Sequence, residues 1–223
     1  MTTRLKEEKG YCPCGHALPL PQRLLNTTIA LGPTFIKFGQ VASTRPDLVP
    51  EEFSLALKRL QEHVPSFPYE EARQIVEEEI GKPLEDVFRQ FDPAPVASAS
   101  LAQVHFAELP DGTPVAVKIQ RPGIKETIEQ DLNILRRVAR QAARLHPGVR
   151  NLRPEEAVNE FGRWTLRELD FRLEGQNLDE FRRNFAGSPD VVFPKVYWEY
   201  TTARILTMER VAGLRVHEGV TSM

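Results

Sequence analysis

The chain has 223 residues, 27% of them charged, and a formal net charge of −2, which suits one domain or one and a half. Its basic residues are not clustered, which argues against nucleic-acid binding. It has no apolar run near the roughly 18 residues of a membrane span, and the charges from Arg4 to Lys9 are not those of a secretory signal. We therefore expect a cytoplasmic protein, free in solution or peripheral at a membrane.

The first 20 residues contain both cysteines, Cys12 and Cys14, with His16 nearby. Two thiols and an imidazole could offer three metal ligands, but a single C-x-C spacing is a weak zinc signal. A loosely ordered N-terminus is the simpler interpretation. We therefore predict a flexible segment over 1–20 and no metal site within this chain.

Helical spacing of apolar residues dominates from residue 21 to residue 92. The predicted helices cover 21–32, 33–42, 51–63, 69–80 and 84–91. Gly32-Pro33 should separate the first two, because proline favours the first turn of a helix, and Gly81 should end the fourth. Lys37 and Gln40 are three residues apart and share a helix face. Such a pair is most often simply solvated.

A small-residue loop, Ala97-Ser-Ala-Ser100, comes next, followed by two strands joined by the turn Asp111-Gly112. Side chains alternate along a strand. The first strand should place Ala102, Val104 and Phe106 on one face and Gln103 and His105 on the other. The second should place Val115, Val117 and Ile119 on a buried face and Ala116, Lys118 and Gln120 opposite.

Lys118 is the most informative residue of these strands. A lysine in a half-buried strand requires a partner, whereas a lysine on an edge strand would simply face water. The small-residue loop upstream favours the first alternative, because kinase N-lobes hold nucleotide phosphates with a flexible loop and a strand lysine. Alanine and serine in place of glycine should change how that loop approaches phosphate.

The remaining chain predicts helices over 122–145 and 154–185 and strands over 191–198 and 203–208. On the second helix, Asp170, Glu174 and Asn177 fall on one stripe, while Glu168 points elsewhere unless the helix bends. Acid–base stripes are usually surface ion pairs. The position of this one favours Glu174 as the partner of Lys118.

Taken in order, these motifs resemble the UbiB/AarF/ADCK family of atypical kinase-like proteins over roughly residues 20–215. The resemblance lies in K-x-G-Q at Lys37–Gln40, the alanine-rich loop at Ala97–His105, the lysine strand at Val115–Gly123, E-x-D at Glu168–Asp170 and a hinge-like Leu206–Glu209 followed by Gly213. It implies an α+β fold in which a protein-kinase-like N-lobe, a small antiparallel sheet with long helices, follows a helical N-terminal extension. The expected ranges are 21–92 for the extension and 93–215 for the lobe.

The resemblance also implies ATP or ADP binding with Mg²⁺, atypical phosphotransfer or ATPase activity, and a link to ubiquinone or other isoprenoid-lipid biosynthesis at membranes. Glu174 would pair with Lys118, and Lys37 and Gln40 would contact the region of Glu168 and Asp170. The residues expected to bind nucleotide are Ala97, Ser98, Ala99, Ser100, Lys118 and Glu209.

The sequence departs from the family in having no H-x-D…N and no D-F-G. We therefore expect the C-lobe to be absent, the end over 216–223 to be truncated, and the metal ligands to come from a C-lobe polypeptide or downstream segment. The leading hypothesis is the N-terminal part of a UbiB-type ATPase. The alternatives are a non-catalytic helical module that regulates or binds membrane or isoprenoid lipid, with a vestigial nucleotide lobe, and a product that does not fold stably alone.

Overall fold

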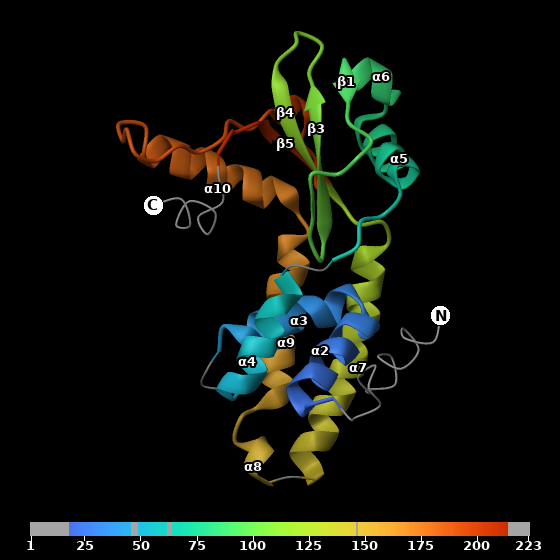
Figure 1. The fold of residues 1–223 in the computed structure, drawn as a ribbon, viewed down its shortest axis with the longest axis vertical. Coiled ribbons are helices and arrows are strands. Elements are labelled where there is room, and N and C mark those ends of the chain that lie inside the picture. The colour runs from blue at the N-terminus through green and yellow to red at the C-terminus, as the bar shows by residue number, and fades with distance from the viewer. Residues whose placement is uncertain (1–17, 46–48, 62–63, 146, 214–223) are drawn as a thin grey trace. The chain divides into compact units, whose positions relative to one another are not determined.

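The structure, a computed structural model, describes residues 18–45, 49–61, 64–145 and 147–213 (Figure 1). The chain divides into two compact units. The helical unit comprises 1–66, 98–101 and 123–167, and the sheet unit comprises 67–97, 102–122 and 168–223. The predicted α+β class is confirmed, whereas the predicted domain ranges stay a prediction. The segments expected to be flexible or truncated, 1–17 and 216–223, lie outside the described residues, as does the Cys12–His16 motif.

The helical unit is built from amphipathic helices. They are α2 (Leu20–Leu31), α3 (Pro33–Ser43), α4 (Glu51–Lys58) with the 3-10 turn η1 (Arg59–Gln61), α7 (Ile124–Leu145), α8 (Pro147–Arg150) and α9 (Pro154–Glu168). Gly32, at φ +98°, separates α2 from α3 at the predicted place. Leu25, Ile36, Leu57 and Leu60 form one core of this unit. A methyl group at Gly39 would lie 2.5 Å from Leu60 Cδ1, so the missing side chain lets α3 pack closely.

The sheet unit contains a mainly antiparallel sheet in the order β1-β3-β4-β5, with β2 beside β3. Its elements are α5 (Tyr69–Ile80), α6 (Leu84–Val87), β1 (Gln90–Phe91), β3 (Ala102–Glu108), β4 (Pro114–Gln120), α10 (Phe171–Asn184), η2 (Trp198–Tyr200) and β5 (Ile205–Glu209). The short strand β2 (Ala97–Ser98) begins in this unit, and its second residue is assigned to the helical unit. Gly81 ends α5 in the left-handed conformation, as predicted.

Helices cover both faces of this sheet, α5 and α6 on one side and α10 on the other (Figure 1). The α5 face is apolar in β4, where Val115, Val117 and Ile119 are fully buried. On the α10 face, Phe171 packs with Leu206 in a second core cluster. The alternation predicted for β4 is therefore present. None of the helices in the described segments is long and apolar enough to cross a bilayer.

Three predicted elements differ from the structure. The helix expected over 84–91 ends at Val87, because Phe88 is extended and Gln90–Phe91 pairs with β3. The helix expected over 154–185 breaks at Leu169–Asp170 into α9 and α10. The strand expected over 191–198 is reduced to an isolated bridge between Val196 and Met208, since Pro194 has no N–H for a ladder.

Two polar side chains of β3, Gln103 and His105, lie on the same buried face of the sheet as the apolar residues of β4. Gln103 pairs with Ile119 and His105 with Val117, and both polar side chains are 0% exposed. Gln103 Oε1 accepts the N–H of Phe67 at 3.0 Å, so its amide NH₂ faces His105 Nε2 at 2.9 Å. His105 Nδ1 lies 2.8 Å from the Asp92 carbonyl. The imidazole is therefore neutral, with its proton on Nδ1.

We expect this histidine to make stability depend on pH. Burial lowers the pKa of His105 below its ordinary value, so its contribution is fully present above about pH 6.5 and falls as pH drops below that value, by at most about 1.4 kcal/mol per pH unit. Urea unfolding at pH 7, 6 and 5 measures the slope. His105→Asn should have a shallower slope across this window. Equal slopes in the two proteins would contradict the assignment.

Candidate functional site

The site centres on an ion pair between β4 and α10. Lys118 Nζ donates to Glu174 Oε1 at 2.9 Å and to Oε2 at 2.7 Å. The side chains remain 23% and 38% exposed, so the pair is open to solvent on one side. A half-solvated pair adds little stability. Its consequence is geometric, because it fixes where the ammonium group lies.

The Lys118 ammonium also contacts an aromatic ring, that of Phe171. Lys118 Nζ lies 4.7 Å from the centroid of the Phe171 ring, within the range of a cation–π contact. Phe171 is only 1% exposed. The lysine therefore has a buried aromatic support and a carboxylate partner, both from the first turns of α10.

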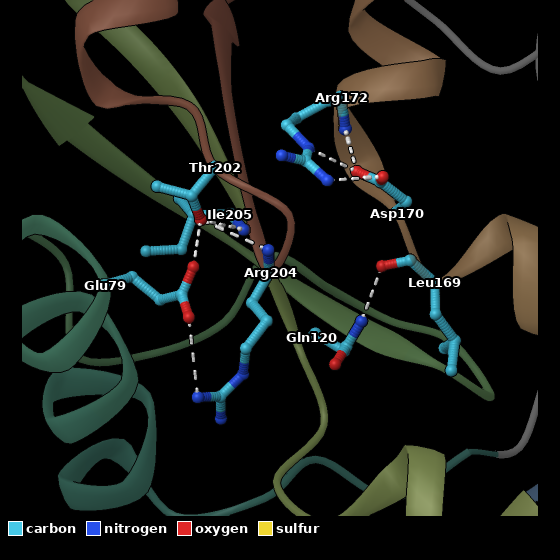
Figure 2. Close-up of polar contacts among 8 residues, drawn as sticks. All are labelled: Glu79, Gln120, Leu169, Asp170, Arg172, Thr202, Arg204 and Ile205. Carbon is cyan, nitrogen blue, oxygen red and sulfur yellow. Dashed lines mark hydrogen bonds and ion pairs between the residues drawn. The ribbon is translucent and has the colours of Figure 1, made fainter.

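The break between α9 and α10 places Glu174. Gln120 Nε2 donates to the Leu169 carbonyl at 2.7 Å, which ties the break to the end of β4 (Figure 2). Asp170 then caps α10, accepting the Arg172 N–H at 3.2 Å. The Arg172 guanidinium also donates to both Asp170 oxygens, at 2.8 and 2.7 Å, and its hydrogen bond lowers the pKa of Asp170. The carboxylate of Asp170 is thus engaged within its own helix start.

A second polar group, which the sequence analysis missed, joins α5 to the start of β5 (Figure 2). Thr202 Oγ1 donates to Glu79 and accepts the N–H groups of Arg204 and Ile205 at 3.1 and 3.2 Å. Arg204 Nη1 lies 3.7 Å from Glu79 Oε1. This group anchors β5, the neighbour of the lysine strand. No short motif marks it, since its members are far apart in sequence.

The expected hinge residue, Glu209, has its side chain on the other face of the sheet. It pairs with Val115, a residue of the face opposite Lys118, and its Oε2 accepts the Lys195 N–H at 3.1 Å. A nucleotide contact by Glu209 would therefore use its main chain. Beyond the strand end, the Arg210 guanidinium lies 3.7 Å from the Phe106 centroid, a further cation that the sequence analysis did not single out.

The alanine-rich loop is shared between the two units. Ala97 belongs to the sheet unit, whereas Ser98, Ala99 and Ser100 belong to the helical unit. Ser100 is buried and Ala97 and Ala99 are exposed. Their expected contact with nucleotide stays a prediction.

The K-x-G-Q motif lies on α3 in the helical unit. Gln40 Nε2 donates to the Leu60 carbonyl at 3.2 Å, and Gly39 allows the close packing of α3 described above. Both residues thus have roles inside their own unit. Glu168 and Asp170 belong to the sheet unit, and their expected contact with Lys37 and Gln40 stays a prediction.

Metal ligands are not grouped in the described part of the chain, where no cluster of three or more His, Cys, Asp or Glu side chains could hold an ion. Glu174 and Asp170 are each paired with a cation. The described residues therefore do not form a cage for Mg²⁺ by themselves.

The chemistry available on the α10 face of the sheet is that of an anion site. An ammonium held by a carboxylate and an aromatic ring is a fixed point charge with N–H donors, which suits a phosphate oxygen. On the same face, Ala116 carries only a methyl group and pairs with Phe106 and Met208. Ala116 is buried, whereas Phe106 and Met208 are partly exposed, so apolar side chains lie on the same face as the charge.

Comparison with known proteins gives consistent matches. The family model of the ABC1 atypical kinase-like domain matches residues 59–221. "Probable protein kinase UbiB" of Marinobacter nauticus is 42% identical over 90% of this chain and 38% of its own length. The uncharacterized protein sll1770 of Synechocystis is 47% identical over 84% of this chain and 32% of its own. The chain therefore spans about a third of the length of such relatives.

Among solved structures, a match is the complex of Rv3197 with erythromycin from Mycobacterium tuberculosis. Its TM-score is 0.59 at 31% sequence identity, and the match covers 82% of this chain and 46% of that chain. This solved chain therefore shares the fold of the matched part.

Proposed function

Because the chain belongs to the ABC1 atypical kinase-like family, we propose that the face of its sheet around Lys118 binds the phosphates of ATP or ADP. The observation that carries this proposal is the position of Lys118 Nζ, held 2.7 Å from Glu174 and 4.7 Å from the Phe171 ring centroid. A lysine held by a helix glutamate is the arrangement that kinases use to orient nucleotide phosphates.

Three residues on this face of the sheet would have separate roles in binding the nucleotide. Lys118 would neutralise phosphate charge, Glu174 would keep the ammonium aimed, and Ala116 would leave room for the base. Phosphoryl transfer depends mainly on such positioning and on charge neutralisation. Magnesium, when bound, would supply further neutralisation of the phosphate charge. Its protein ligands would have to come from parts that the longer relatives possess.

The relatives named UbiB support a wider proposal, that the protein takes part in ubiquinone or other isoprenoid-lipid biosynthesis as an atypical kinase or ATPase. The competing proposal, a non-catalytic lipid-binding module, has less support. A lipid-binding module would need an amphipathic helix such as α4 or α5 at the membrane surface. These helices instead bury Leu57 and Ile75 in the cores of their units, whereas a helix lying on a membrane exposes its apolar face.

Thermal unfolding with added nucleotide tests the proposal. Mg-ADP and Mg-ATP should raise the unfolding temperature in a saturable manner, since a ligand that binds only the folded state stabilises it in proportion to ln(1 + [L]/Kd). Inorganic phosphate at the same concentration is the control. Absence of any nucleotide-dependent shift, with a cooperative transition otherwise intact, would contradict nucleotide binding by this chain. Flotation with liposomes in the same buffer tests the lipid alternative.

A further inference from the structure

The segment that leads into β5 runs along α10 and contacts it at several points. Phe193 stacks on Phe181, with ring centroids 5.2 Å apart, and lies tilted against Phe185, with centroids 5.5 Å apart. Further along, Trp198 Nε1 donates to Asp179 Oδ2 at 2.8 Å. These contacts are separate from the Lys118 pair, yet they hold the helix that carries Glu174.

Helix α10 also packs tightly against this segment at Gly175, the residue directly after Glu174. A methyl group there would lie 2.9 Å from Cη2 and 3.4 Å from Cζ2 of Trp198, and 3.4 Å from Leu206 Cδ1. A real Cβ atom essentially never lies within 3.0 Å of another non-bonded heavy atom. The helix therefore lies as close to the indole as a residue without a side chain permits.

The backbone next to Trp198 is hydrogen-bonded to β5. The preceding residue, Tyr197, donates its N–H to the Thr207 carbonyl at 2.9 Å, and Val196 forms a bridge with Met208. The indole thus belongs to a segment fixed to β5. Leu206, the other neighbour of Gly175, pairs directly with Lys118 across β4 and β5.

These contacts connect the indole to the ion pair. We propose that Trp198 is a positioning residue: its indole, seated on Gly175 and bonded to Asp179, sets the distance between α10 and β5 and so keeps Glu174 within reach of Lys118. A shift of α10 at Gly175 moves the adjacent Glu174, while Lys118 stays with Leu206 in the sheet.

The separation of Lys118 and Glu174 can be measured without any nucleotide. A water-soluble carbodiimide joins an amine to a carboxylate only when the two are in contact, and both side chains are partly exposed to reagent. Mass spectrometry then quantifies the Lys118–Glu174 cross-link. Gly175→Ala should lower its yield about fivefold, the effect expected of a modest steric displacement. Gly187→Ala is the matched control, because a methyl group there meets nothing within 4 Å.

A double variant separates positioning from general damage. Trp198→Phe alone should lower the cross-link, because it removes the hydrogen bond to Asp179 and the atoms that seat on Gly175. In the Gly175→Ala background the same change should raise it, since the shorter ring leaves room for the methyl group. This reversal of sign is specific to the contact. A Trp198→Phe effect of the same sign in both backgrounds, or full cross-linking in Gly175→Ala, would overturn the proposal.

Fluorescence provides a second measurement if a variant folds poorly. The sequence has two tryptophans, so Trp164→Phe leaves Trp198 as the only indole. Asp179→Ala in that background should shift the emission of Trp198 and lower the cross-link together; a shift without cross-link loss would count against the proposal. The consequence for nucleotide rests on the proposed function. If cross-linking follows the prediction while no nucleotide shift exists, nucleotide binding fails and the positioning role of Trp198 stands.

Discussion

Phe171→Ala is expected to lower the free energy of unfolding by about 3–5 kcal/mol, the range for a phenylalanine removed from a packed core. The ring is 1% exposed and packs with Leu206 and Val196 beneath α10. Its loss also removes the aromatic support of the Lys118 ammonium. Urea unfolding followed by circular dichroism measures the change.

Phe185→Ala is the matched control for this prediction. Phe185, just past the end of α10, is 42% exposed, so its removal should cost about 1 kcal/mol or less. Phe171→Leu should recover much of the stability, because it restores apolar volume, but not the cation–π contact. If Phe171→Ala and Phe185→Ala were equally destabilising, the assigned core beneath α10 would be wrong.

Lys118→Met is expected to weaken nucleotide binding by about tenfold or more, a loss of about 1.4 kcal/mol or more. Methionine keeps an unbranched apolar stem over Phe171 but removes the charge that would meet the phosphates. Stability should change little, because the Lys118–Glu174 pair is half-solvated. Isothermal titration calorimetry with Mg-ADP measures the affinity.

The control for the lysine variant is Lys82→Met, which removes an exposed lysine from the loop after α5. Its affinity for Mg-ADP should equal that of the unchanged chain. If Lys82→Met and Lys118→Met lost affinity equally, the effect would be one of overall charge. In that case Lys118 would not mark the phosphate site.

Much of the site was predictable because it depends on local periodicity. Alternation along β4 places Val117 and Lys118 on opposite faces, and the i, i+4 stripe indicates Glu174 as a partner. The bend that Glu168 and Asp170 would need if both served one site is also present, at the junction of α9 and α10. There Asp170 acts as an N-cap, a role that aspartate favours in any sequence.

The other features of the fold and site depend on contacts between residues far apart in the sequence, which periodicity cannot reveal. Gln103 and His105 can be buried because each has a hydrogen-bond partner: Gln103 accepts the N–H of Phe67, and His105 bonds to the carbonyl of Asp92. The strand Gln90–Phe91 looked helical by spacing, but its pairing with β3 determined its conformation, as tertiary context often overrides local propensity. The contact of Trp198 with Gly175 joins residues whose proximity no local pattern in the sequence indicates.

The most direct test of the central claim is labelling with an acyl-phosphate derivative of ATP, which transfers its acyl group to a lysine lying beside the bound phosphates. The account predicts that Lys118 is the lysine labelled most strongly, that excess Mg-ATP suppresses this label, and that Mg-ATP leaves the labelling of Lys82 unchanged. Labelling of Lys118 no greater than that of Lys82, or labelling that ATP does not reduce, would contradict a nucleotide site at the Lys118–Glu174 pair.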